Sequence, residues 1–286
     1  MQIYNAEQES YQRAARIIRD CNAVLITAGA GLGVDSGLPD FRGTEGFWQA
    51  YPAFRKKGLD FFDLANPRWF KDDPRQAWGF YGHRMSLYRA ALPHEGFHIM
   101  LDWVRRIEQN YFVFTSNVDG HFQRTGFSPD RIHECHGSFE FLQCSEACTS
   151  QLWSAAETEI EIDEESFTAN TPIPKCPICS AAARPNILMF GDSRFVPDYH
   201  QAQNQKYNQW LSGLSAPTQI AIVEIGAGTA IPTVRSESEK IARKFNQPMI
   251  RINPRDNSGP DSCISIGTGG LESLRQIENE LRLIQP

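Results

Sequence analysis

The chain of 286 residues has no apolar run that approaches the roughly 20 residues needed to span a bilayer. Its N-terminus, MQIYNAEQESYQRAARIIRD, also lacks the apolar core of a secretory signal peptide. We therefore expect a cytoplasmic protein that makes no contact with a membrane.

The chain is also short of positive charge, with 28 Lys and Arg against 34 Asp and Glu. Because nucleic-acid binding requires a surplus of cations that neutralise phosphates, we expect no nucleic-acid partner. The 41% hydrophobic and 22% charged residues are typical of a globular protein. A chain of this length can form one large domain with an insertion, or two modest domains.

Short apolar runs alternate with amphipathic segments. Residues 7–21 have helical spacing and precede the first apolar run. The apolar runs are 23–26, 111–115, 220–225, 249–252 and 264–266, and the amphipathic stretches are 97–109, 237–245 and 271–284. Runs without polar alternation predict strands that are buried on both faces, and hence an α/β fold with a Rossmann-like parallel sheet.

Two regions interrupt this alternation. Residues 41–95 are rich in aromatic residues and proline, while residues 139–188 contain two cysteine pairs and an acidic stretch, 157–165, that we expect to be a solvated loop. We predict that these two insertions form a small second domain. The larger, Rossmann-like domain would then consist of residues 1–40, 96–138 and 189–286.

A glycine-rich turn follows the first predicted strand, at Gly29, Ala30 and Gly31. Glycine at this place in an α/β sheet lets the backbone approach a pyrophosphate near a helix N-terminus. The turn is not the G-x-G-x-x-G fingerprint, because position 34 is Val34. By itself it is equally compatible with a tight turn in an unrelated α/β protein.

Three longer segments decide between these alternatives. TAGAGLGVDSGLPDFRG, TSNVDGHF and HECHGS together resemble the sirtuin family of NAD-dependent protein deacylases. The resemblance implies that the larger domain binds NAD. The residues that it implies for NAD binding are Gly29, Ala30, Gly31, Asp40, Phe41, Arg42, Trp48, Ser116, Asn117, Asp119, Gly226, Gly228, Asn253, Arg255 and Gly267.

The resemblance also implies catalytic roles for three residues. His136 would be the general base, Asn117 would orient the ribose or a water, and Asp119 would contact the nicotinamide amide. A histidine suits this role because its ordinary pKa, near 6.5, lets it accept a proton from a ribose hydroxyl. The substrate would be an acylated lysine of a protein, held along Phe190 and Gly191, and the products would be nicotinamide and O-acyl-ADP-ribose.

Some positions depart from the family pattern. Gly33, Ser116 and Ala227 stand where other residues are usual in the family. An NAD-dependent ADP-ribosyltransferase or an NAD hydrolase therefore remains an alternative activity.

Four cysteines are spaced as two pairs, Cys144-x3-Cys148 and Cys176-x2-Cys179. Four thiolates can hold Zn²⁺ in a closed tetrahedral site, which leaves no position open for catalysis. The resemblance implies a zinc module at this place, so we expect structural zinc. Incidental cysteines, or an inactive zinc-bearing binding scaffold, are the alternatives.

Tyr81 and Arg84 lie three residues apart in a predicted helix and therefore share a face. They resemble the Tyr-x-x-Arg pair of sirtuins that remove succinyl or malonyl groups, which implies a preference for negatively charged acyl chains. The alternative is that Arg84 is a solvated helix charge and Tyr81 a core aromatic residue.

Overall fold

The computed structural model describes residues 2–39, 47–49, 51–163, 165–170, 172–215 and 218–284. The three predicted residues Asp40, Phe41 and Arg42 lie outside the described residues. Among the described residues, no helix is both long and apolar enough to cross a membrane.

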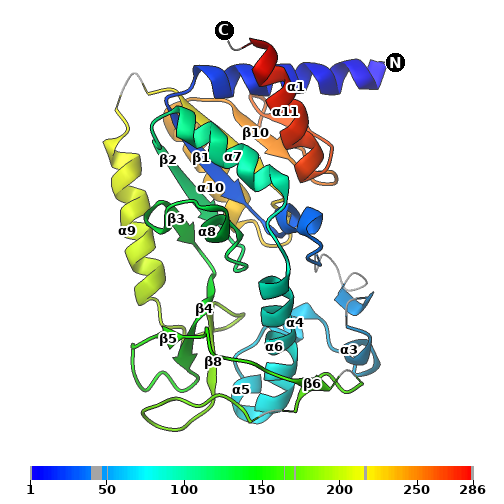
Figure 1. Ribbon diagram of the computed structural model, residues 1–286, viewed down its shortest axis with the longest axis vertical. Coiled ribbons are helices and arrows are strands. Elements are labelled where there is room, and N and C mark those ends of the chain that lie inside the picture. The colour runs from blue at the N-terminus through cyan, green and yellow to red at the C-terminus, as the bar shows by residue number, and fades with distance from the viewer. Residues whose placement is uncertain are drawn as a thin grey trace.

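The centre of the larger lobe is a six-stranded sheet in which all neighbouring strands are parallel (Figure 1). Its order is β11-β10-β9-β1-β2-β3. The bounds are β1 Ala23–Ala28, β2 Tyr111–Thr115, β3 Ile132–Glu134, β9 Ile220–Ile225, β10 Met249–Ile252 and β11 Ile264–Ile266. Every residue of β1, β2 and β9 is buried, which confirms the parallel sheet expected from uninterrupted apolar runs.

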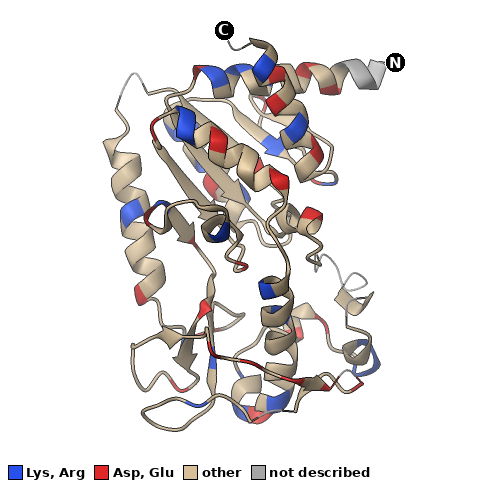
Figure 2. Cartoon of the chain, viewed as in Figure 1, with Lys and Arg blue, Asp and Glu red and all other residues tan. Residues whose placement is uncertain are grey.

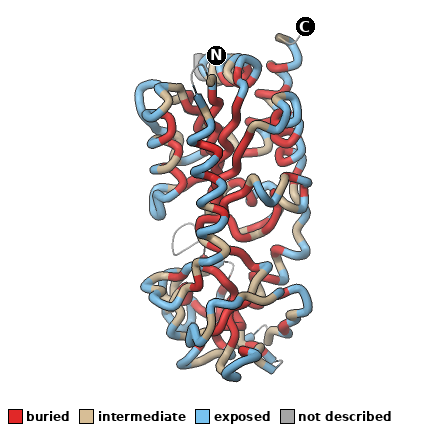
Figure 3. Tube along the Cα trace, turned by 90° about the vertical axis from the view of Figure 1, so that its left-hand side faces the viewer, coloured by how far each residue is buried: buried red, intermediate tan, exposed pale blue. Residues whose placement is uncertain are grey.

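Helices cover both faces of this sheet. Val24 and Ile26 of β1 belong to one apolar cluster with residues of α1, α7 and α11. Ala23 and Leu25 point to the opposite face and cluster with residues of α9 and α10. The helix bounds are α1 Gln2–Asp20, α7 Glu95–Arg106, α9 Asp198–Gly213, α10 Thr233–Phe245 and α11 Gly270–Ile284. Figure 3 shows the buried chain running through the interior of this layered lobe.

One ion pair lies inside the sheet. Arg251 of β10 faces Glu224 of β9 in register, with 2.6 Å between Nε and Oε1, and neither side chain is exposed. Most other charged residues lie on the outer helices and loops, with both signs interspersed in the view of Figure 2.

The smaller lobe combines segments from both predicted insertions. Its helices are α3 Pro52–Lys56, α4 Phe61–Leu64, α5 Trp69–Asp72 and α6 Pro74–Ala90. Its strands are β4 Gly137–Cys144, β5 Trp153–Ser154 and β8 Ala183–Ile187, which form an antiparallel sheet, and the hairpin of β6 Ile162–Asp163 and β7 Thr168–Ala169. An apolar cluster separate from those of the larger lobe joins these helices and strands. The exact boundaries of the two domains stay a prediction.

The acidic segment 157–165 is not simply a solvated loop, so that prediction was wrong in part. It contains β6, and Ile160 is buried against α6. A Cβ at Gly82 of α6 would lie only 2.8 Å from the Cβ of Ile160, so this contact needs glycine. Apolar Ile160 anchors the segment, while the glutamates on either side stay exposed.

Three short elements lie in the loops next to the sheet strands. They are the 3-10 helices η1 Ala30–Ser36 and η2 Pro129–Arg131 and the helix α8 His121–Thr125. η1 follows β1 directly, and α8 lies between β2 and β3, so both lie beside the carboxyl ends of sheet strands.

Candidate active site

A cavity of about 620 Å³ opens at the carboxyl ends of the parallel strands. Gly29 follows β1, Ser116 follows β2, His136 lies just beyond β3, and Gly226 follows β9; all four line the cavity. Open α/β sheets bind ligands at this edge because the turns there expose backbone N–H groups. The smaller lobe closes the other side of the cavity through residues of α4 and α6.

Two glycine turns meet at the floor of the cavity. A Cβ at Gly29 would lie 2.7 Å from the carbonyl oxygen of Gly226, and a Cβ at Gly226 would lie 2.3 Å from the nitrogen of Leu32. Gly226 also has a φ of 65°, which side chains rarely tolerate. Only glycine fits both positions, and the bare backbone can approach an anionic ligand closely.

The loop after β2 holds a polar group that has no partner. The backbone N–H of Asn117 donates to Thr115 Oγ1 over 3.0 Å, and this hydroxyl donates to the carbonyl of Ala28 over 3.1 Å. These bonds leave the buried Nδ2 of Asn117 without a hydrogen-bond partner among the described residues. Since a buried donor without a partner is costly, a ligand hydroxyl fits this position.

Asp119 completes this loop. Its Oδ1 accepts the backbone N–H of His121 over 2.9 Å, and the residue lines the cavity together with Asn117 and Ser116.

His136 lies where the two lobes meet. Its carbonyl accepts the N–H of Leu188, which follows β8, over 2.9 Å. The next residue, Gly137, has a φ of 81°, and a Cβ there would lie 2.1 Å from the carbonyl oxygen of Asn186. Burial, and secondarily the neighbouring His200, lowers the pKa of His136. A histidine in this state is neutral at physiological pH and can accept a proton.

The predicted cofactor residues fall into two groups. Those that line the cavity are Gly29, Ala30, Ser116, Asn117, Asp119, Gly226, Gly228 and Arg255. Those that are not among the described lining residues are Gly31, Trp48, Asn253 and Gly267.

Some members of the second group have structural partners. Asn253 donates to the carbonyl of Ala227 over 2.8 Å and accepts the N–H groups of Arg255 and Asp256, so it braces the two loops that hold Arg255 and Gly228. Trp48 donates to the carbonyl of Leu59 over 2.8 Å. Their direct contact with a cofactor stays a prediction.

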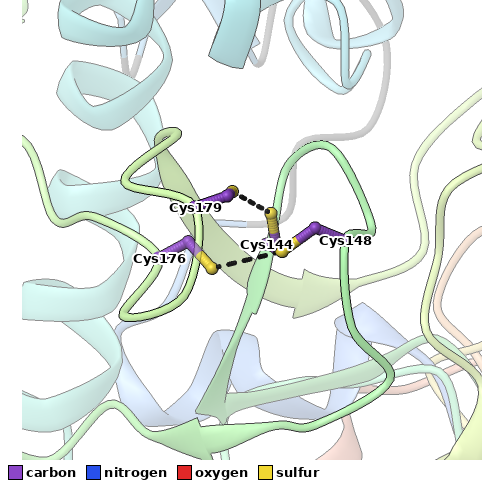
Figure 4. Close-up of side chains that lie close together, drawn as sticks. All are labelled: Cys144, Cys148, Cys176 and Cys179. Carbon is purple, nitrogen blue, oxygen red and sulfur yellow. Dashed lines mark hydrogen bonds between the residues drawn. The ribbon is translucent and has the colours of Figure 1, made fainter.

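The four predicted metal ligands converge in the smaller lobe (Figure 4). All four sulfur atoms lie within 4.8 Å of one another, with 3.5 Å between Cys144 and Cys179 and 3.6 Å between Cys148 and Cys176. Thiolates around zinc at about 2.3 Å would be roughly 3.8 Å apart in a tetrahedron. The donor set therefore fits a closed zinc site and is not an incidental grouping.

The sequence model of the Sir2 family matches residues 29–211, which is more than half of the chain. The chain belongs to the Sir2 family. The NAD-dependent protein deacylase of Aquifex aeolicus is 28% identical, over 84% of this chain and 86% of that protein. The corresponding deacylase of Aeropyrum pernix is 30% identical, over 87% and 88%. A Sir2 homologue solved in complex with NAD has a TM-score of 0.70 at 23% identity and covers 95% of this chain and 93% of that one, which shows the shared fold.

In this Sir2-family chain the end of the cavity inside the smaller lobe is aromatic and contains one buried cation. Arg84 is only 7% exposed, so its interpretation as a solvated helix charge is wrong. Its guanidinium carbon lies 5.3–5.8 Å from the ring centroids of Phe61, Phe80, Tyr81, Tyr88 and Phe139. Burial acts to lower the pKa of Arg84, but the neighbouring tyrosines raise it overall. Tyr81 and Arg84 both line the cavity.

Phe190 and Gly191 follow β8 in the chain, beside this Sir2-family cavity. Phe190 lines it, donates its N–H to the carbonyl of Ala65 over 2.9 Å, and packs on Phe62 with 4.8 Å between ring centroids. Gly191, with a φ of 67°, makes the turn that follows and is not among the described lining residues.

The sequence analysis missed α9 and its contacts with Glu134, two residues before His136. Gln203 of α9 accepts the backbone N–H of Glu134, and Tyr199 donates to the carboxylate of Glu134 over 3.1 Å. Burial raises the pKa of Glu134 to about 7. Only four side chains of α9 are buried, and its mostly polar sequence has little apolar periodicity. No local signal in the sequence therefore indicated these contacts.

Proposed function

We propose that this Sir2-family protein is an NAD-dependent protein-lysine deacylase whose preferred acyl groups end in a carboxylate, such as succinyl or malonyl. The products would be nicotinamide and O-acyl-ADP-ribose. The acyl preference is supported by one observation above all, the charged and buried Arg84 in the lining of the cavity.

The residues around the cavity suit the chemistry of this reaction. NAD, when bound, would supply the ribose carbon to which the acyl oxygen adds as the bond to nicotinamide breaks. We propose that Asn117 donates its unpartnered Nδ2 hydrogen to a ribose hydroxyl or a positioned water. Asp119 would accept a hydrogen bond from the nicotinamide amide, and the neutral His136 would accept a proton from a ribose hydroxyl so that this oxygen can attack the acyl carbon.

A carboxylate that enters a buried channel loses water contacts worth several kcal/mol, so the site must replace them. Arg84 can do so with two parallel N–H bonds to the carboxylate. The surrounding rings exclude water and strengthen that attraction. An acetyl group offers no carboxylate to this cation, which favours the longer, charged acyl chain.

The substrate peptide would lie along the segment after β8. Among the described strands, β8 pairs only with β4, so its other edge can accept an extended chain as an added strand. Phe190 and its partner Phe62 would then contact side chains next to the acylated lysine.

Replacement of Arg84 by methionine tests the acyl preference. We expect kcat/KM for succinyl-lysine to fall relative to that for acetyl-lysine by about 2–5 kcal/mol, the scale for truncating one partner of a buried charge pair. Arg89→Met is the matched control, because Arg89 lies on the same helix but outside the cavity lining. Equal losses on both substrates would mean that Arg84 only supports the fold.

Nicotinamide release, measured with and without acylated peptide, tests the reaction itself. Release that depends on the peptide supports a deacylase. Release without peptide would instead indicate an NAD hydrolase or an ADP-ribosyltransferase that uses other acceptors, and no release would indicate an inactive zinc-bearing scaffold. The cytoplasmic location and the absence of a nucleic-acid partner stay predictions.

A further inference from the structure

Tyr88 lies one helical turn beyond Arg84 on α6 and shares its end of the cavity. Its hydroxyl oxygen accepts two hydrogen bonds from the same guanidinium, from Nε over 3.2 Å and from Nη2 over 2.8 Å. The ring of Tyr88 packs edge-on against Phe139, with 5.3 Å between centroids, and the residue is only 8% exposed. The hydroxyl is therefore held in one position by both packing and charge.

A phenol oxygen has two acceptor lone pairs and one proton. Because the lone pairs of Tyr88 face Arg84, the proton must point away from the guanidinium. No described residue accepts this proton, and Tyr88 lines the cavity. The O–H group is thus a buried donor that is satisfied only by something inside the cavity.

The position of Tyr88 is also coupled to the catalytic loop. Arg124 donates from Nη2 to the carbonyl of Tyr88 over 2.7 Å and to the carbonyl of Asp119 over 3.3 Å. Its Nη1 donates to the carbonyl of Arg89 over 3.2 Å. One side chain therefore sets the last turn of α6 against the loop that contains Asn117 and Asp119.

We propose that Tyr88 is a specificity-determining residue whose hydroxyl donates a hydrogen bond to the carboxylate at the end of the acyl chain. The guanidinium of Arg84, which donates to Tyr88 from Nε and Nη2, supplies the positive charge beside this donor. Together the two residues form a preassembled set of donors that a neutral acyl chain of equal length cannot use. The proposal deepens the proposed function and rests on its preference for carboxylated acyl groups.

The test compares the parent with Tyr88→Phe, which keeps the ring on Phe139 and removes only the hydroxyl. Dissociation constants are measured by calorimetry for succinyl-lysine and butyryl-lysine forms of one peptide, and deacylation with NAD is followed on both. A hydrogen bond to a charged group contributes about 1.5–3 kcal/mol, so the preference for succinyl over butyryl should fall at least about tenfold. Tyr51→Phe is the control, because Tyr51 is buried in the same lobe but does not line the cavity.

The outcomes separate this inference from the proposed function. An unchanged preference in Tyr88→Phe, or an equal weakening of both peptides, overturns the role of Tyr88, as does a parent that does not prefer the succinyl peptide. If the parent binds the succinyl peptide in a Tyr88-dependent manner but releases no deacylated product, the role of Tyr88 stands and the deacylase activity fails.

Discussion

The ion pair between Arg184 and Asp192 should be one of the most sensitive points of the smaller lobe. Arg184 Nη2 lies 2.7 Å from Asp192 Oδ2, and neither side chain is exposed. The same carboxylate accepts the N–H groups of Met189 and Arg194, and Arg184 Nη1 lies 3.3 Å from the sulfur of Met189. The pair therefore shapes the turn that presents Met189 and Phe190 to the cavity.

Asp192→Asn keeps the size of the side chain but leaves the buried guanidinium without its counter-charge. Breaking one partner of a buried pair costs about 3–5 kcal/mol, whereas replacing both partners with apolar residues is often close to neutral. We expect the free energy of unfolding to fall by that amount in Asp192→Asn and in Arg184→Met. The double variant Arg184→Met/Asp192→Leu should recover a large part of the loss.

Urea unfolding of the parent, Arg184→Met, Asp192→Leu and the double variant gives the coupling energy directly, provided that the slope of the transition is unchanged. KM for an acylated peptide should rise in the single variants, since the turn that presents Met189 and Phe190 to the cavity loses its support. Single variants that lose less than about 1 kcal/mol, or a double variant whose loss equals the sum of the two, would refute the reasoning.

Three further predictions concern other parts of the molecule. Metal analysis should find about one zinc per chain in the parent, and a metal-free parent would contradict this. Cys176→Ala should lose the metal and unfold at a lower temperature, because a four-thiolate site couples metal binding to folding. His136→Ala should lower deacylation on the order of 10² or more while nicotinamide exchange falls less, since the histidine acts after the first bond breaks; near-normal deacylation would exclude His136 as the base. Burial, with the neighbouring His200, lowers the pKa of His133 to about 3, whereas a histidine in an unfolded chain has a pKa of about 6.5. The contribution of the neutral His133 to the free energy of unfolding is therefore complete above about pH 6.5 and is lost as the pH falls towards 3. Glu134, whose pKa is raised to about 7, acts in the opposite direction, so the effect of His133 is isolated by comparing His133→Asn with the parent from pH 7 to 4. The free energy of unfolding should fall less steeply with falling pH in His133→Asn than in the parent. Parallel curves would contradict the assignment.

Local sequence determined much of this fold, because the features concerned depend on residues close together in the chain. The run 220–225 has no polar alternation except Glu224, so a strand that is buried on both faces could be predicted from it. The turn at Gly29 and the spacing of the paired cysteines were visible for the same reason. The His136-Gly137 pair was also recognisable from the sequence. The reason why position 137 needs glycine was not, because a Cβ there would lie 2.1 Å from the carbonyl oxygen of Asn186, far along the chain.

Only the tertiary structure decided how distant segments complete the site. Glu134 meets Gln203 across 69 positions in the chain, through a helix whose polar sequence gave no periodic signal. Arg84 and Tyr88 lie four residues apart, a spacing that allows a contact on any helix. Their burial at the end of a cavity depends on Phe139, which comes from strand β4. Helices and strands follow from short-range periodicity, whereas the burial, charge state and partners of a side chain depend on what the rest of the chain packs against it.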